Sequence, residues 1–143
     1  MNDTAPDSFE LHDHDADVAI VGEAGTRAGA LVQAARGLTA CITDPAAVRP
    51  AAARRVVAEG TGAGDVLVNW LRALLDLYNA EGFLGSEFTL AEYSDTRAAG
   101  EARGEALVPG RHAVLHEVKG VTWHAAVLHE KGGRWFARVI VDV

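Results

Sequence analysis

Residues 65–80, DVLVNWLRALLDLYNA, carry the clearest structural signal in the chain. Apolar side chains recur there at spacings of three and four residues, which is typical of an amphipathic helix with one buried face. Asp65 is favoured by the helix dipole at the start of this segment, and Gly82 just beyond it is a residue that commonly ends helices. We therefore predict a central helix, and we expect Trp70 and Tyr78 to belong to the core rather than to a ligand platform.

A second helix is predicted upstream. Residues 27–42 repeat the same apolar spacing, and Thr26 is suited to cap the first turn. β-branched and apolar residues favour strands over residues 16–21 and 52–59. Cys41 lies near the end of this helix without a neighbouring histidine pattern, so we expect a buried structural thiol rather than a nucleophile.

Downstream of the central helix the sequence favours strands. Residues 88–93 alternate between apolar and polar positions, and residues 118–130 and 134–141 alternate on either side of a Lys-Gly-Gly turn typical of a hairpin. Residues 96–107 are ambiguous, because their alanines and glutamates favour a helix whereas two glycines oppose it.

This order of elements predicts an α+β fold with a single domain. We expect two helices packed on one face of a mostly antiparallel β-sheet. Residues 1–10 are small, polar and acidic and are predicted to form a disordered N-terminal tail, which leaves residues 11–143 as the folded domain.

The composition limits the classes of function. The chain has 143 residues, 49% of them hydrophobic, and a formal charge of −7, which disfavours a protein that binds DNA or RNA directly through phosphates. Cys41 is the only cysteine, so neither a disulfide framework nor a cysteine-based zinc site is predicted. No apolar run long enough to cross a membrane and no signal-peptide pattern occur, and a soluble cytoplasmic protein is expected.

Candidate metal ligands occur near both ends of the chain. Residues 12–17, HDHDAD, place two histidines and three aspartates just before an apolar run, and residues 141–143, VDV, place Asp142 in a β-branched chain end. If the final strand is docked beside the first, Asp17, Asp142 and the Val143 terminus come together and repel each other unless a cation or a proton is bound. The alternative is a solvated acidic turn and two chain ends that never meet.

Four segments of the sequence, in order, resemble the archease family. Residues 14–18 (HDADV) resemble its His-Thr-Ala-Asp-Val/Ile opening, and residues 69–71 (NWL) its central helix. Residues 117–124 (EVKGVTWH) resemble its Glu-Val-Lys-Ala-Ile/Val-Thr-Tyr-His signature, and residues 141–143 its hydrophobe-Asp-Ile/Val end. Aspartate at position 15 and tryptophan at position 123 depart from the family's usual threonine and tyrosine.

The resemblance implies a divalent-cation site. Its ligands would be Asp17, Asp142 and the main chain of Val143, and the cation would be Ca²⁺, with Mg²⁺ or Mn²⁺ as alternatives. The accessory positions near the site are His14, Asp15, Lys119 and His124.

The resemblance also implies a function. Archease-like proteins activate an RtcB-type RNA ligase by promoting its guanylylation and multiple turnover in tRNA splicing and RNA repair, and they are not themselves enzymes. RNA would then be reached only indirectly, through the ligase. Two alternatives from other classes are a small metal-dependent hydrolase that uses Asp17 and Asp142 with His14 as general base, and a chaperone-like binding module.

Overall fold

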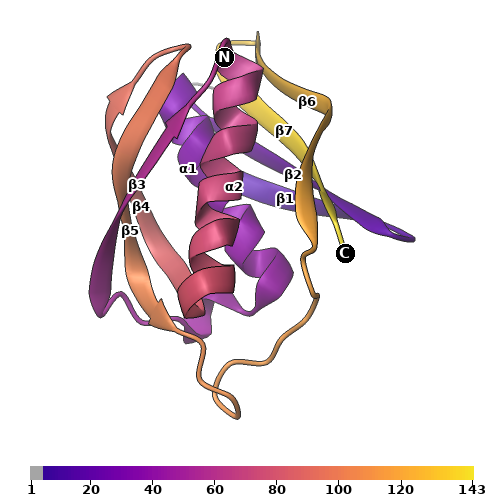
Figure 1. Cartoon of the computed structure of the whole chain (residues 1–143). Helices are drawn as coiled ribbons and strands as arrows, with labels where there is room; N and C mark the ends of the chain where they lie inside the picture. Colours follow the sequence, from indigo (N-terminus) through magenta and orange to yellow (C-terminus); the bar gives the residue numbers. More distant parts are fainter. Residues whose placement is uncertain (1–4) are drawn as a thin grey trace.

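Two antiparallel sheets enclose a pair of helices in the computed structural model, which describes residues 5–143 (Figure 1). The four-stranded sheet has the order β1 (Ser8–His14), β2 (Asp17–Ala24), β7 (Arg134–Asp142) and β6 (Gly120–Lys131). The three-stranded sheet has the order β3 (Ala52–Glu59), β5 (Arg97–Ala106) and β4 (Phe83–Tyr93). The predicted α+β class is confirmed, but the strands are divided between two sheets instead of forming one.

Helix α1 (Arg27–Ile42) explains why two sheets are needed. Ten of its 16 residues are buried, and they are distributed around most of its circumference, so the helix needs cover on more than one side. It packs on β2 and β7 in one sheet and on β4 in the other. The predicted bounds of this helix are confirmed, and the Thr26 hydroxyl accepts a hydrogen bond from the Gly29 amide at 3.0 Å, as a capping residue does.

Helix α2 (Ala63–Glu81) lies beside β3 and β6 and closes the core from the other side. Trp70 is completely buried, as predicted, and its indole N–H donates to the Leu31 carbonyl oxygen at 3.0 Å, which joins the two helices. Tyr78 is half-buried and packs against the core. Gly82 ends the helix in the left-handed conformation, with φ of 70°.

The ambiguous segment 96–107 forms strand β5, and its two glycines have a role there. A Cβ atom on Gly100 would lie 1.8 Å from the Thr89 carbonyl oxygen, and one on Gly104 would lie 1.7 Å from that of Leu84. β4 therefore approaches β5 more closely than any side chain at these positions would permit. The glycines that weaken a helix are the residues that this sheet requires.

The predicted N-terminal tail is partly wrong. Residues 8–10 belong to β1, which pairs with β2 along its whole length, whereas residues 1–4 lie outside the described part of the chain. The buried Arg134 fixes this start, because its guanidinium donates to the Pro6 carbonyl oxygen at 3.0 Å and to the Glu23 carboxylate at 3.1 Å. Within residues 5–143, no helix is both long enough and apolar enough to cross a membrane.

Candidate metal centre

Asp17 and Asp142 lie directly opposite each other in the four-stranded sheet. Asp17 begins β2 and Asp142 ends β7, and the antiparallel register pairs the two residues. Their neighbours Val18 and Val141 are buried, so strand alternation turns both carboxylates out of the core. The structure thus brings together the two aspartates that the sequence proposed as ligands.

The backbone around this pair is fixed by hydrogen bonds. The Val143 amide donates to the Ala16 carbonyl oxygen at 3.1 Å, and the Lys119 amide donates to the Asp142 carbonyl oxygen at 2.8 Å. The bond between Val143 and Ala16 makes these two residues a hydrogen-bonded pair of the ladder. The next pair, Asp17 and Asp142, is therefore a non-hydrogen-bonded pair, the kind in which side chains come closest. The main chain of Val143 is therefore held beside the aspartate pair.

The donor set of this site is rich in oxygen but small. Among the residues that the structure describes, no group of three histidine, cysteine, aspartate or glutamate side chains is placed to hold a metal ion. Two carboxylates and a main-chain oxygen fit a hard cation, but Ca²⁺ takes about six to eight oxygen ligands. The remaining coordination positions would fall to water or to groups of another molecule.

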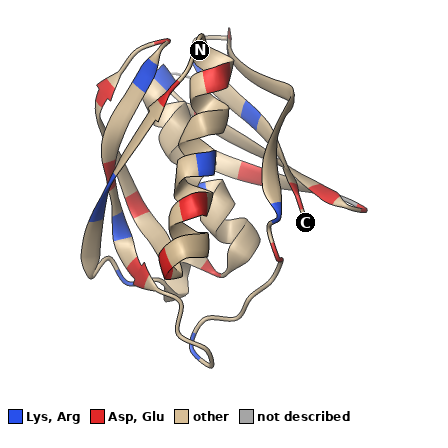
Figure 2. Cartoon of the chain, viewed as in Figure 1, with Lys and Arg blue, Asp and Glu red and all other residues tan. Residues whose placement is uncertain are grey.

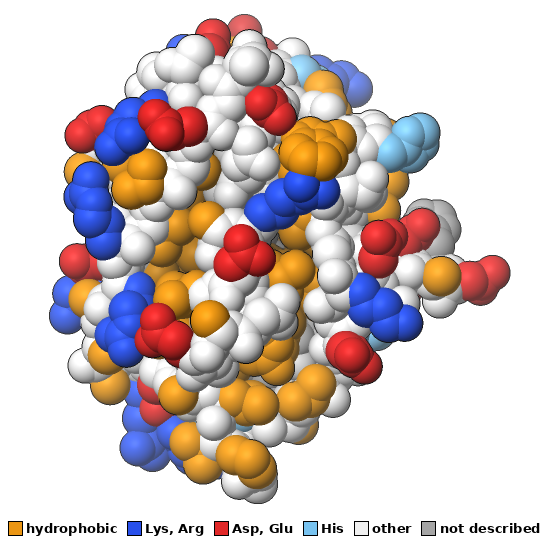
Figure 3. All heavy atoms as spheres, viewed as in Figure 1, with side chains coloured by type: hydrophobic (Ala, Val, Ile, Leu, Met, Phe, Trp, Pro, Cys, Tyr) orange, Lys and Arg blue, Asp and Glu red, His pale blue; other side chains and the backbone are white. Residues whose placement is uncertain are grey.

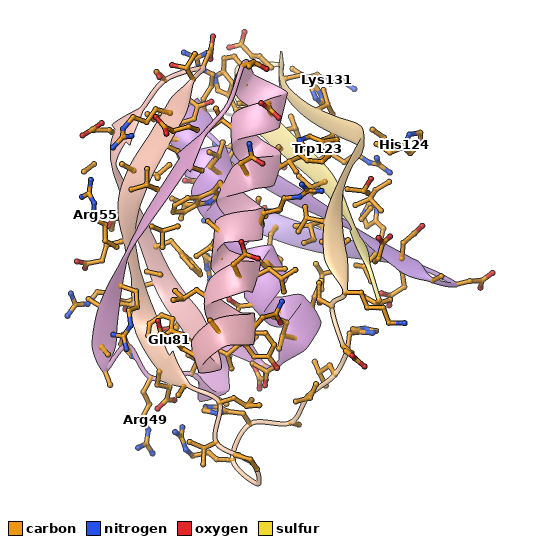
Figure 4. The ribbon with its side chains drawn as sticks, viewed as in Figure 1. Arg49, Arg55, Glu81, Trp123, His124 and Lys131 are labelled. Carbon is orange, nitrogen blue, oxygen red and sulfur yellow. The ribbon has the colours of Figure 1, made fainter. Side chains whose placement is uncertain are left out.

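The fold places some of the other candidate residues near the aspartate pair and others away from it. Asp15 is exposed in the two-residue turn between β1 and β2, and Lys119 is exposed immediately before β6. The backbone of His14 pairs with Asp17, but its side chain lies outside the described part of the structure. Gly120 on β6 is the register partner of Asp142. His124 lies four residues along β6 from Gly120, roughly 13 Å away at strand spacing, and points away from the body of the molecule (Figure 4). The structure therefore does not bring His124 to the site.

Acidic positions gather at this end of the sheet. Figure 2 shows them in the hairpin of β1 and β2 and beside the C-terminus, on the same side of the molecule. Like charges directly opposite on neighbouring strands are destabilising, so this arrangement has a physical reason to bind a cation.

A polar groove of about 510 Å³ runs from Asp142 between α2 and the start of β6. The residues of α2 that line it include Arg72, Asp76 and Asn79, none of which the sequence analysis selected. Their spacing of four and three residues places them on one polar side of the helix, and this polar side could have been recognised from the sequence. The proximity of β6 was not detectable, because it depends on how distant segments pack.

The fold and the site define a class of small α+β proteins with two antiparallel sheets and a pair of aspartates at one sheet end. The chain belongs to the archease protein family, whose family model matches residues 9–143. It is 36% identical over 138 residues to the archease of Methanopyrus kandleri, covering 94% of this chain and 99% of that protein. It is 29% identical over 136 residues to the archease of Sulfurisphaera tokodaii, covering 94% and 98%. The predicted family resemblance is therefore confirmed.

Two solved structures share the fold. The solution structure of protein 1598 of Methanobacterium thermoautotrophicum has a TM-score of 0.81 and 31% identity, with 95% of this chain and 99% of that chain covered. The crystal structure of an archease from Thermotoga maritima, described as a possible chaperone, has a TM-score of 0.56 and 13% identity, with 94% and 96% covered. At that identity the Thermotoga structure supports the fold alone.

Proposed function

We propose that this protein is a cytoplasmic accessory factor that activates an RtcB-type RNA ligase in tRNA splicing and RNA repair. In this proposal Asp17, Asp142 and a main-chain oxygen of Val143 hold a divalent cation on which activation depends. The observation that carries it is the pairing of Asp17 with Asp142 at one sheet end. Membership of the archease family supports it, since the sequence resemblance implies this activity.

The geometry suggests how the residues would act. Asp142 is exposed and Asp17 is half-buried at the end of the sheet, so both carboxylates can reach into the active site of a larger protein without rearranging the core. A bound hard cation would supply charge that neutralises the two carboxylates and can be shared with oxygen ligands of the partner. The hydrogen bonds of Val143 and Lys119 hold the backbone in place while the side chains bind. The chain then acts as a positioning factor, and the ligase performs the chemistry.

The experiment is a guanylylation assay with the cognate ligase, GTP and Mn²⁺. We expect the parent protein to accelerate guanylylation and to permit repeated turnover. Asp17→Asn and Asp142→Asn keep the side-chain shape but remove a charge, and both should lose most of the acceleration. Glu130→Gln, an exposed change on β6, is the matched control for net charge and should activate like the parent.

The same preparations separate the alternatives. Parent-like activation by both aspartate variants would show that the aspartate pair has no part in the activity. Hydrolysis of phosphoesters by the protein alone, lost in both variants, would support the hydrolase instead. Suppression of the aggregation of unrelated unfolded proteins, without any effect on the ligase, would support a chaperone-like module.

A further inference from the structure

Trp123 is held rigidly on the surface of the protein. It is 51% exposed, although tryptophan is large and mostly apolar. Its indole N–H donates to the Asp65 carboxylate at 2.9 Å, and the guanidinium carbon of Arg72 lies 3.4 Å from the centre of its ring. Figure 4 places Trp123 on β6 next to α2, the helix that supplies both contacts. The ring is thus fixed in one orientation while much of it stays open to solvent.

A distortion of β6 presents this side chain. Thr122 pairs with Ile140 and Val127 pairs with Arg138, so the four residues 123–126 stand opposite Val139 alone. Within this bulge Ala125 has φ of 59°, a conformation that residues other than glycine rarely adopt. Bulges redirect side chains, and backbone strain persists where the surrounding structure enforces it. The regular strand is interrupted at the place where Trp123 is exposed.

The groove links Trp123 to the aspartate pair. Arg72 stacks on Trp123 and also lines the groove, and Asp142 lines the other end. The Arg72 guanidinium donates twice to the Val121 carbonyl oxygen, at 3.0 and 2.7 Å, which fixes the groove wall. Figure 3 shows hydrophobic and charged side chains around the hollow between α2 and β6. Trp123, the groove and Asp142 therefore form one continuous surface, which we call the tryptophan groove.

We propose that the tryptophan groove is the docking surface for the partner protein, with Trp123 as its anchor. This inference rests on the proposed function and adds the surface that gives affinity. Tryptophan and arginine are the residues most enriched among those that dominate binding energy at protein interfaces. Trp123 and Gly120 are three residues apart, roughly 10 Å along the strand. A typical interface of about 800 Å² per partner has a radius of roughly 16 Å, so one footprint covers both Trp123 and Asp142.

The charge of this surface favours a protein over a nucleic acid. The groove is lined by two acidic side chains, Asp76 and Asp142, and by two basic ones, Arg72 and Lys119, so its own charges balance. The chain carries a formal charge of −7, which opposes the approach of phosphates. The Arg72 guanidinium is occupied by the Val121 carbonyl and the Trp123 ring. The occupant is therefore a protein surface with an apolar pocket for Trp123 and with charged side chains of both signs along the groove.

The test measures affinity and maximal activation separately. Trp123→Ala should raise the Kd for the cognate ligase at least tenfold, whereas the guanylylation rate at saturating protein should approach that of the parent. Asp142→Asn should show the opposite pattern, with a reduced rate that saturation does not restore. Val57→Ala removes an exposed apolar side chain from β3 in the other sheet, and its Kd and rate should equal those of the parent.

Amide hydrogen exchange in the parent protein gives a second test that needs no variant. Addition of the ligase should slow exchange in residues 119–124, and unchanged exchange there would overturn the inference even if Trp123→Ala failed to fold. Binding of a single-stranded RNA oligonucleotide to the protein alone, lost in Trp123→Ala, would also overturn it. If folded Trp123→Ala binds the ligase with the same Kd as the parent, the docking surface alone is rejected. If the parent protein fails to activate the ligase, the proposed function and this inference are rejected together.

Discussion

Replacement of Asp142 by asparagine should make the protein more stable than the parent when no cation is bound. When a cation is bound, the same variant should be less stable than the parent. Asp142 lies opposite Asp17 in a pair whose Cβ atoms are typically about 4.5–5.5 Å apart. Two unit charges about 5 Å apart repel by about 0.8 kcal/mol in water and by about 3 kcal/mol at an effective dielectric constant of about 20. Because Asp142 is exposed, the lower end applies, and Asp142→Asn should raise the free energy of unfolding by about 0.5–1 kcal/mol.

A bound cation should reverse this order. At a cation concentration of about 100 times the Kd, binding to the folded state stabilises the parent by about 2.7 kcal/mol. The asparagine variant loses a charged ligand and most of that gain, so the parent should become about 2 kcal/mol more stable than the variant. Relief of charge repulsion alone cannot change the sign of this difference.

The assay is urea unfolding of both proteins, first with a chelator and then with increasing Ca²⁺. Glu130→Gln again controls for net charge, because its register partner on β7 is Trp135 and not a carboxylate. If Asp142→Asn is less stable than the parent in the chelator, repulsion between the aspartates is not the dominant interaction at this site. If Ca²⁺ stabilises both proteins equally, Asp142 is not a ligand.

Three further predictions concern the fold. Leu71→Ala and Leu74→Ala should each lower the free energy of unfolding by about 2–5 kcal/mol, because both side chains are buried, and parent midpoints in urea would contradict this. The Arg111 guanidinium, with further hydrogen bonds, lowers the pKa of Glu105 from 4.5 to about 2, so its contribution to stability is complete above pH 4.5 and is lost as the pH falls towards 2. Glu105→Gln should remove this loss of stability at low pH, measured as urea midpoints between about pH 2 and pH 4.5. A variant with the same pH profile as the parent would show that the Glu105–Arg111 pair is not the source of the loss. Burial raises the pKa of the Cys41 thiol to about 12, so a thiol reagent at about pH 8 should react only as fast as the protein opens, and rapid labelling of the native protein would show that the thiol is accessible.

The sequence by itself determined the local elements because their signals are local. The apolar spacing of residues 27–42 gave the bounds of α1, and Thr26 and Gly82 marked helix ends through their own hydrogen bonding and backbone conformation. The Lys-Gly-Gly turn predicted the hairpin of β6 and β7 for the same reason. Asp17 and Asp142 were found as a possible pair because the residues around both are β-strand formers and the family resemblance joins them.

Only the tertiary structure decided which strands lie side by side. Strand periodicity tells which face a residue occupies but not which strand it meets, so the division into two sheets and the register of Asp17 with Asp142 depend on packing around the helices. His124 belongs to the same sequence signature as Lys119 but lies away from the aspartate pair, because it is further along β6 and within the bulge of that strand. The exposure of Trp123 also depends on this bulge, in which four residues of β6 stand opposite one residue of β7. The bulge has no local sequence signal, since it is set by how β6 fits between β7 and α2.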